Sequence, residues 1–567
     1  MELRIWKNVL VLGLFFFTTF VFLTSEVVHG APWTMTYGGK YQDGVRHFRQ
    51  TSDGGFILPG WKYYSKSEYD AWAVRLDARG DIEWQKTYGM GTYAGLISIQ
   101  ETLGGGYIGS GWIYPDPSNL QNRDMWILKV DSNGGIEWQK RYGGSNGEEG
   151  RSILQTMDEG YIVAGYTNSF GLLGVWVLKL DSVGNVQWQK TFGGWGIEIR
   201  SILQTPDEGY VLTAMTDSYG AGEYDAWVLK LDKNGNSEWQ KTYGGNQSDY
   251  GQSVYRTSDG GYILAGSTRS FGAGDADGWV LKLDANGNIQ WQKTYGGANG
   301  DWLIGIRQTS DGGYLAAGGT SSFGAGNGDG WVLKLDASGG IEWEKTLGGK
   351  KYDGFISIQE TSDAYVLAGE TESFGAGSYD IWLSKIEKDG NTGNCSAAAN
   401  SAATVTDTTA TQTNITVVGQ DSTASPQTTN ASEKETEVIP KFLCGIPDLT
   451  GSWISLDQTC NPTSKGQKCK VSGTLSVDNI GHRDAPSCSV KFYLSDDENY
   501  DEGVDSYMKK VSTGKIKVGA SKTKKLSYSF GVGDTATGKY VVAVIDADHA
   551  VVEGDEANNE IPFGPIP

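Results

Sequence analysis

Hydrophobic and polar residues alternate in short runs along most of the chain, and turns rich in Gly and Asp separate the runs. Residues 252–297 contain four such runs, and the clearest of them places Trp279 and Leu281 on one side and Val280 and Lys282 on the other. Alternation with a period of two predicts buried or half-buried β-strands. Four antiparallel strands within about 50 residues are typical of one blade of a β-propeller.

The four-run pattern is repeated through residues 33–390, and a tryptophan heads the last run each time. These tryptophans are separated by 50 to 54 residues, and they are Trp33, Trp84, Trp138, Trp188, Trp239, Trp291 and Trp343. A second set lies in the third run of each repeat and comprises Trp72, Trp126, Trp176, Trp227, Trp279, Trp331 and Trp382. A fixed period of this length indicates a repeat architecture.

The order of the runs predicts how the repeats close. The fourth run follows only six of the seven third runs, and the matching phrase Trp33–Gly39 precedes the first repeat instead. We therefore expect the N-terminal strand to complete the last blade, because closure removes the open sheet edges that favour aggregation. The predicted fold is all-β, with a seven-bladed propeller over residues 31–392.

Residues 283–291, which read Leu-Asp-Ala-Asn-Gly-Asn-Ile-Gln-Trp, resemble the tryptophan-docking repeats of quinoprotein-like (PQQ-type) propellers. The resemblance covers residues 33–390 and implies that each tryptophan packs one blade on the next. It does not extend to the PQQ chemistry of that family. No cysteine lies between Trp33 and Asn394, so the vicinal disulfide of many quinoprotein dehydrogenases is absent.

Residues 1–30 have the pattern of a secretory signal. Arg4 and Lys7 precede an apolar run from Val9 to Leu23, and small residues stand before Ala31. The alternative is an uncleaved anchor, but this run is short for a membrane-spanning helix. We expect a secreted or cell-surface protein with no membrane span after cleavage.

Residues 393–443 are rich in Thr, Ser and Ala, which predicts a disordered linker because few apolar side chains offset the chain entropy. Residues 444–567 alternate again and predict a β-sandwich. The segments 447–450, 490–495 and 552–560 resemble a CARDB domain, an Ig-like module of bacterial and archaeal surface proteins. That resemblance implies adhesion or presentation rather than catalysis.

With a secretory signal, cysteines indicate disulfides. The candidates in this domain are Cys444, Cys460, Cys469 and Cys488, which allow one or two bridges, and Cys395 is left over. The spacing does not fix the connectivity. A zinc site is the rival interpretation, although no Cys-x-x-Cys pair occurs.

The formal net charge is −21 and the isoelectric point is about 4.7. Such acidity argues against a nucleic-acid partner, since phosphate backbones bind cationic surfaces. It suits solubility or a divalent cation. One dense acidic loop offers calcium ligands, with a plain solvated loop as the alternative, and its candidates are Asp496, Asp497, Glu498 and Asp501. No other cofactor is predicted.

Catalytic candidates are few. His47 interrupts a row of small residues on the first run, which we expect to line the central channel, so it is either a ligand contact or a tolerated substitution. Glu101 and Glu360 replace Gln at equivalent positions, and they are the basis of one alternative function, an extracellular polysaccharide hydrolase or lyase.

Aromatic residues on the irregular loops of the first two repeats are the best candidates for a binding surface. They are Trp61, Tyr63, Tyr64, Trp112 and Tyr114. The sequence therefore favours a non-enzymatic scaffold that binds an extracellular glycan or protein. A purely structural surface or matrix protein is the second alternative.

Overall fold

The computed structural model describes residues 32–65, 68–89, 93–116, 119, 122–170, 174–193, 197–393, 398–401, 404–408, 411–414, 420–421, 427–428, 432–435, 441–444, 449–480, 484–501, 504–517, 519–547 and 559–566. The predicted signal segment lies outside these ranges. Within them, no helix has the length and apolar character that a membrane crossing requires. The elements are β-strands, which confirms the all-β class.

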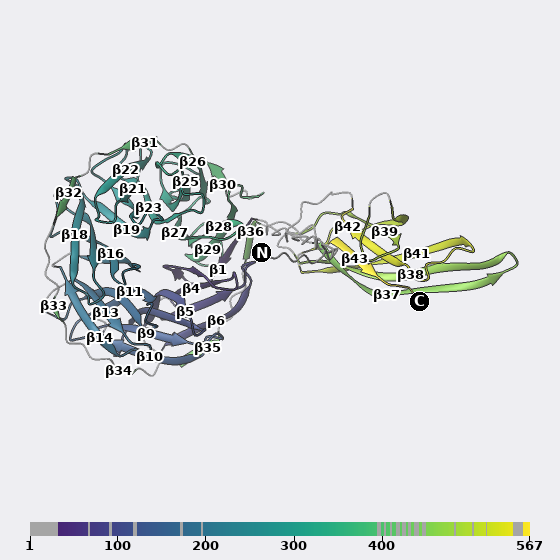
Figure 1. The fold of residues 1–567 in the computed structure, drawn as a ribbon, viewed down its shortest axis with the longest axis horizontal. Coiled ribbons are helices and arrows are strands. Elements are labelled where there is room, and N and C mark those ends of the chain that lie inside the picture. Colours follow the sequence, from purple (N-terminus) through teal and green to yellow (C-terminus); the bar gives the residue numbers. More distant parts are fainter. Residues whose placement is uncertain are drawn as a thin grey trace, which may run out of the picture.

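Each repeat forms one antiparallel sheet whose strands follow the chain order, and Figure 1 shows these sheets arranged around a common centre. The first strands are β2 (Asp43–Val45) with β3 (Arg49–Gln50), β7 (Ala94–Glu101), β11 (Glu148–Gln155), β15 (Glu198–Gln204), β19 (Asp249–Arg256), β23 (Asp301–Gln308) and β27 (Asp353–Glu360). The second strands are β4 (Phe56–Tyr63), β8 (Tyr107–Ile113), β12 (Tyr161–Thr167), β16 (Tyr210–Thr216), β20 (Tyr262–Thr268), β24 (Tyr314–Thr320) and β28 (Ala364–Thr371).

The third and fourth strands complete the sheets. The third strands are β5 (Tyr69–Leu76), β9 (Asp124–Val130), β13 (Gly174–Leu180), β17 (Asp225–Leu231), β21 (Asp277–Leu283), β25 (Asp329–Leu335) and β29 (Asp380–Glu387). The fourth strands of the first six repeats are β6 (Ile82–Gly89), β10 (Ile136–Tyr142), β14 (Val186–Phe192), β18 (Ser237–Gly244), β22 (Ile289–Gly296) and β26 (Ile341–Leu347).

The N-terminal strand β1 (Trp33–Tyr37) occupies the fourth place in the last sheet. It pairs antiparallel with β29 in a register that sets Thr34 opposite Ser384, and the hydroxyls of these two residues lie 2.9 Å apart. Trp33 and Met35 also share one hydrophobic cluster with Trp72 of the first repeat and Leu383 of the last. The strand therefore contacts both ends of the repeat array.

The third strands are buried on both faces, because each is an inner strand of its sheet and packs against neighbouring sheets. In repeats two to six, all seven residues of the third strand are buried, and the indoles of all seven third-strand tryptophans have no exposed surface. An indole of this kind buries about 150–250 Å². The third strands thus supply the core that joins sheet to sheet.

The fourth strand of each repeat is also fastened to the turn of the next repeat. Tyr243 donates its hydroxyl hydrogen to the Gly287 carbonyl at 2.6 Å, and Trp239 lies over the same glycine. Gly287 has a φ of 72°, and a Cβ there would lie 2.7 Å from the Trp239 ring, so the turn requires glycine for two reasons. The same tyrosine bond is made by Tyr37, Tyr88, Tyr142 and Tyr295.

Aspartates at the start of the third strands anchor the preceding loops, as short polar side chains do at strand ends. Asp225 accepts the backbone N–H groups of Ala221 and Gly222 at 2.8 and 3.2 Å. Burial raises the pKa of Asp225 to about 6, the two N–H groups oppose the rise, and Asp249 adds to it. Asp43 lies instead at the start of the first strand β2, and burial likewise raises its pKa to about 6.

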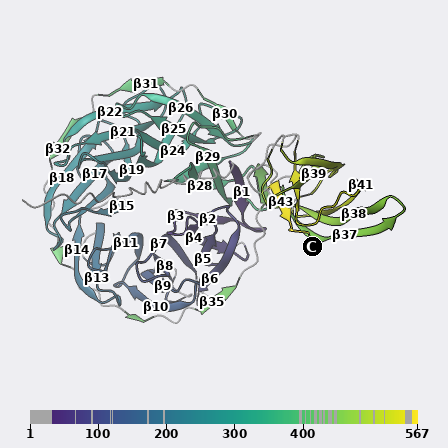
Figure 2. The same cartoon turned by 45° about the vertical axis from the view of Figure 1, so that its right-hand side comes forward.

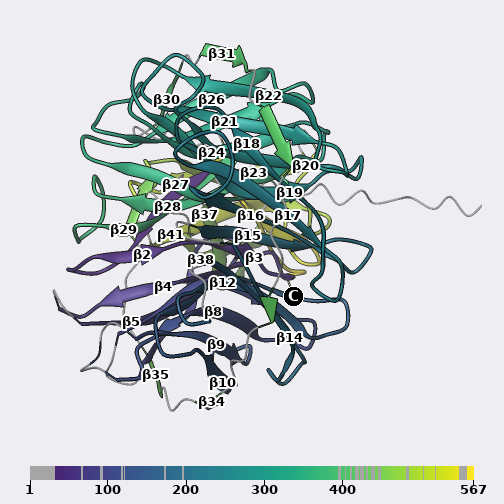
Figure 3. The same ribbon diagram turned by 90° about the vertical axis from the view of Figure 1, so that its left-hand side faces the viewer.

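The segment between the two domains is the main departure from the predicted fold. Its described residues are not disordered but paired, one strand on the outer edge of each sheet, and both Figure 1 and Figure 3 place β31, β34 and β35 at the periphery. The pairs are β30 (Ala398–Asn400) with β26, β31 (Thr404–Asp407) with β22, β32 (Thr411–Asn414) with β18, β33 (Gln420–Asp421) with β14, β34 (Gln427–Thr428) with β10, β35 (Ser432–Glu435) with β6 and β36 (Lys441–Cys444) with β1.

We call β30–β36 the outer belt. The prediction of disorder was wrong for these residues, because composition reports only whether a segment can form a core of its own. The fourth strands present a row of unpaired backbone N–H and C=O groups, and any extended chain can pair with such an edge. Threonine-rich sequence is well suited to that conformation.

The C-terminal residues form two packed sheets, and Figure 2 shows a long hairpin of this domain pointing away from the repeats. One sheet contains β37 (Leu449–Thr463), β38 (Gly466–Asn479) and β41 (Ser521–Val532). The other contains β39 (Ser489–Ser495), β40 (Ser506–Ser512), β42 (Tyr540–Ile545) and β43 (Glu560–Phe563). One hydrophobic cluster between the sheets confirms the predicted sandwich.

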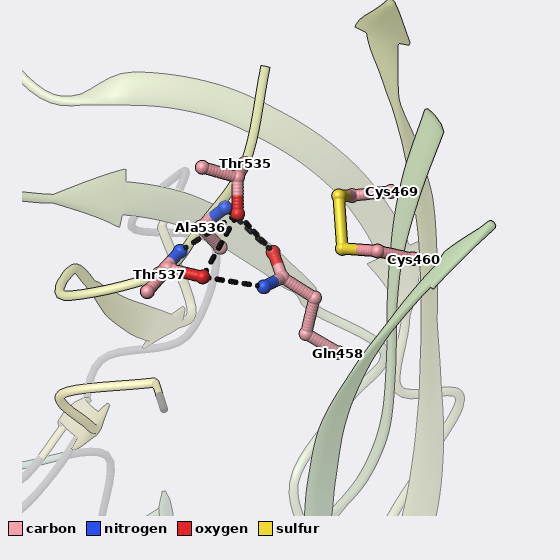
Figure 4. Close-up of a disulfide and its surroundings, with 6 residues drawn as sticks. All are labelled: Gln458, Cys460, Cys469, Thr535, Ala536 and Thr537. Carbon is pink, nitrogen blue, oxygen red and sulfur yellow. Dashed lines mark hydrogen bonds between the residues drawn. A yellow bond between two sulfur atoms is a disulfide. The ribbon is translucent and has the colours of Figure 1, made fainter. Parts of the chain in front are cut away.

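One disulfide is present among the described cysteines, and it joins Cys460 to Cys469 at directly paired positions of the β37–β38 hairpin (Figure 4). Gln458, on the same strand, donates to Thr537 at 2.8 Å and accepts from Ala536 at 2.6 Å. Cys488 is buried, its Sγ lies 3.5 Å from the Thr513 hydroxyl, and it is not part of this disulfide. Only the backbone of Cys444 is described, and Cys395 lies outside the described ranges.

Replacing Tyr243 by Phe tests the bond between repeats. The Gly287 carbonyl loses a buried donor, and we expect a loss of about 1–3 kcal/mol in the free energy of unfolding, measured with denaturant on the full chain. Tyr64→Phe is the matched control, since Tyr64 is 43% exposed and water can replace its bond to Thr87. Equal effects of the two changes would contradict the assignment.

The raised pKa values predict an unusual pH dependence. Folded Asp225 keeps its proton up to about pH 6, above its usual pKa of 3.8, so its contribution is complete below about pH 4 and is lost as the pH rises through 6. The unfolding free energy of wild type relative to Asp225→Asn should therefore increase between pH 7 and pH 4. Below pH 4 this difference should stay constant, while the unfolding free energies of both proteins fall together, because Asp207, Asp259 and Asp311 have pKa values lowered to about 2. A pH-independent difference between the two proteins would contradict this account.

Candidate functional site

The first strands of all seven repeats line one cavity of about 690 Å³. Six of these strands carry a register shift at the same place, and the residue inserted there is Ile97, Arg151, Arg200, Gln252, Ile304 or Ile356. In the first repeat the strand is interrupted altogether between Val45 and Arg49. A β-bulge redirects a side chain, and every bulged residue lines the cavity.

His47 lines the cavity beside the small residues Ser98, Ser152, Ser201, Ser253, Gly305 and Ser357, as its position in the sequence predicts. Its Nδ1 is buried and has no hydrogen-bond partner. Burial lowers its pKa well below 6.5, and the nearby Arg49 and Arg307 lower it further. His47 is therefore a neutral imidazole near neutral pH.

The dominant chemistry of the cavity is cationic. Six arginines line it against a single acidic residue, Glu198, although the whole protein has a net charge of −21. The arginines are Arg46, Arg49, Arg151, Arg200, Arg256 and Arg307. Sequence reasoning missed this feature, because charge summed over the chain does not reveal which residues the repeats bring to one cavity.

The arginines at the bulge positions are partly neutralised. Arg151 pairs with Glu149 at 2.6 Å, and Arg200 pairs with Glu198 at 2.7 Å. Arg46 lies over the Trp61 ring, 5.1 Å from its centroid. Arg46 therefore lines the cationic cavity and also contacts the aromatic residue Trp61.

Aromatic residues occupy one cross-strand position in five of the seven repeats, and we call them the aromatic collar. They are Trp61, Trp112, Tyr166 and, on first strands, Tyr250 and Trp302. Each indole lies opposite a glycine. A Cβ at the opposing Gly44, Gly95 or Gly319 would lie 2.4–2.5 Å from the ring, so these glycines make room for the tryptophans.

The collar adjoins the cavity. A second pocket of about 370 Å³ is lined by Tyr250 and Trp302, and it shares Arg200, Gln252 and Ile304 with the main cavity. Trp302 also stacks on Tyr352, with ring centroids 6.1 Å apart and an interplanar angle of 7°. The sequence did mark Trp302 as unusual, because this tryptophan lies outside the two repeated sets.

The predicted aromatic candidates are brought together only in part. Trp61 and Trp112 lie 5.9 Å apart, but Trp61 exposes only 9% of its surface. Tyr63 connects to Tyr114 through Tyr69 and Tyr93, with successive centroid distances of 4.7, 5.1 and 6.1 Å.

Tyr64 lies apart from this group, and its hydroxyl donates to Thr87 at 2.6 Å. It is half-exposed, with 43% of its surface accessible.

Glu101 and Glu360 are engaged in joining repeats. Glu101 accepts the backbone N–H and hydroxyl of Ser52 at 2.6 and 2.9 Å, and Glu360 does the same for Ser310 and pairs with Lys388 at 2.9 Å. Gln155, Gln204 and Gln308 hold the equivalent turns. These carboxylates therefore fasten turns of neighbouring repeats and do not form a facing pair.

The predicted calcium loop is exposed and its acids are dispersed. Asp496 pairs with Lys539 at 2.7 Å, and Asp497 accepts the N–H of Asn499 at 2.9 Å. Glu498 and Asp501 are exposed. Over the described part of the chain, no group of three or more His, Cys, Asp or Glu side chains is placed to hold a metal ion.

Comparison with known proteins identifies the smaller domain. Residues 446–562 match the CARDB family model, so this part of the chain is a CARDB domain, as its sequence resemblance implied. No curated protein matches the chain.

Two solved structures are similar to parts of the chain. One is the CARDB domain of a Pyrococcus furiosus protein in complex with di-metal ions, with 20% identity, 21% of this chain and 85% of that chain covered, and a TM-score of 0.15. The other is a eukaryotic initiation factor, with 10% identity, 57% and 97% covered, and a TM-score of 0.27.

Proposed function

We propose that residues 31–392 form a closed seven-bladed propeller of the tryptophan-docking type. Three observations support closure: β1 pairs with β29, Tyr37 donates to the Gly80 carbonyl of the first repeat, and one cavity is lined by all seven first strands. In this arrangement the last sheet lies against the first, and the cavity is the central channel.

The propeller is proposed to act as a secreted or cell-surface scaffold that binds an extracellular glycan without catalysis. The observation that carries this proposal is the aromatic collar, since the flat faces of sugars pack on indole and phenol rings in the same way as other apolar surfaces. The disulfide and the CARDB domain are compatible with an extracellular location.

The collar favours binding over hydrolysis because its polar neighbours lack an acid–base pair. A glycosidase needs two carboxyl groups on opposite sides of one bond, whereas Glu101 and Glu360 are occupied at separate turns. The neutral His47 has no carboxylate partner among the described residues.

A disulfide engineered between Thr34 and Ser384 tests closure. These residues are directly paired, so Thr34→Cys with Ser384→Cys should cross-link on oxidation and shift the mobility of the chain on a non-reducing denaturing gel. Thr34→Cys with Ser310→Cys is the control and should not cross-link. Failure of the first pair to react in folded protein would contradict closure by β1.

Glycan binding is tested with an array followed by calorimetry on the neutral oligosaccharide that binds best. Trp302→Ala should weaken that binding at least about tenfold, equivalent to about 1.4 kcal/mol, because a stacking surface is removed. Tyr507→Ala removes an exposed ring from the CARDB domain and should leave affinity unchanged. Absence of glycan binding, or equal affinity of Trp302→Ala and wild type, would contradict the proposed function.

A further inference from the structure

Two arginines in the cavity lack the carboxylate partners that Arg151 and Arg200 have. Arg49 belongs to the first repeat and Arg307 to the sixth, yet Arg307 lies close enough to lower the pKa of Arg49. Within the described residues neither forms an ion pair, and the Arg49 Nε is buried without a hydrogen-bond partner. The fold therefore brings two like charges together.

The surroundings of this pair do not neutralise it. Arg307 lies over the Tyr255 ring at 5.1 Å, and Glu360, the carboxylate that raises its pKa, is already held by Ser310 and Lys388. Burial is the largest cause of the lowered pKa of Arg49, which is about 10, so the guanidinium stays charged at neutral pH. Two charged guanidinium groups with few partners in a confined cavity are costly unless an anion joins them.

A hydroxyl that lines the same cavity can also donate a hydrogen bond. The Ser253 hydroxyl is buried and unpartnered, and it lies in the same cavity wall as the two arginines. Arginine and hydroxyl donors suit the oxygens of a carboxylate, sulfate or phosphate, and the guanidinium can donate two parallel bonds to such a group. The site is therefore matched to an oxyanion.

The volume of the cavity and the pocket next to it indicate which kind of molecule bears the anionic group. The cavity has a volume of about 690 Å³, which exceeds the needs of a single small ion, and it shares the lining residues Arg200, Gln252 and Ile304 with the pocket beside the collar. A ligand with a sugar ring on the collar would extend its charged substituent toward the arginines.

We propose that Arg49 and Arg307 bind the carboxylate or sulfate group of an acidic glycan. This inference rests on the proposed glycan-binding function and specifies the ligand class. Neutral glycans would contact the collar alone, whereas acidic glycans would also contact the two arginines.

Matched pairs of glycans test the inference on the full chain. Affinity is measured for polygalacturonate against its fully methyl-esterified form, and for dextran sulfate against dextran. We expect the acidic member of at least one pair to bind ten times more tightly or better, with a preference that falls as salt is raised. The double variant Arg49→Gln with Arg307→Gln should lose the preference and keep the affinity for the neutral member.

Two further measurements guard against misfolding and non-specific charge effects. Arg79→Gln, on an exposed turn, should keep the preference. The double variant should unfold at a higher temperature than wild type in low salt without glycan, because a like-charge repulsion has been removed. A lower unfolding temperature would contradict the unpaired state of the two arginines.

The possible failures are distinguishable. Equal affinity for acidic and neutral members, or a preference that survives in the double variant, overturns the inference and leaves the proposed function intact. Binding of no glycan overturns both. Stabilisation by inorganic sulfate alone, lost in the double variant and unaccompanied by glycan binding, overturns the assignment of the anion to a glycan.

Discussion

The attachment of each fourth strand to the turn of the next repeat is the interaction on which the rest of the structure depends. A tryptophan ring covers the turn glycine in all seven sheets, and in five of them a tyrosine hydroxyl also donates to the glycine carbonyl, as Tyr243, Trp239 and Gly287 illustrate. The contact fixes the distance and rotation between neighbouring sheets. It is repeated with Tyr37 of the N-terminal strand, which is why that strand can join the last repeat to the first.

A framework held in this way leaves the inner strands free to vary. The bulge position holds arginine in some repeats and isoleucine or glutamine in others, while the backbone shift is the same. The cationic cavity and the aromatic collar therefore arise from side chains that differ between repeats with the same backbone structure. Their adjacency, with Arg46 lying over Trp61, is the basis of the proposal that the ligand is an acidic glycan.

The sequence predicted those features that depend on the repeat period and on the alternation of apolar and polar residues. The strand positions and the buried third-strand tryptophans follow from the spacing of the repeats and the alternation within each run. The paired state of the outer belt did not follow, since it is mediated by backbone groups of the sheet edges. The cavity arginines were missed because they come from different repeats, and the pairing of Trp302 with Gly319 depends on a cross-strand register that composition does not show.

Hydrogen exchange of the β1 amides tests the central claim most directly. If Trp33–Tyr37 forms the fourth strand of the last sheet and joins the ends of the array, its inward-bonded amides should exchange as slowly as those of β21 in the middle of the chain. Exchange of the β1 amides at the rate of an unprotected peptide, while β21 remains protected, would contradict closure of the repeats by the N-terminal strand.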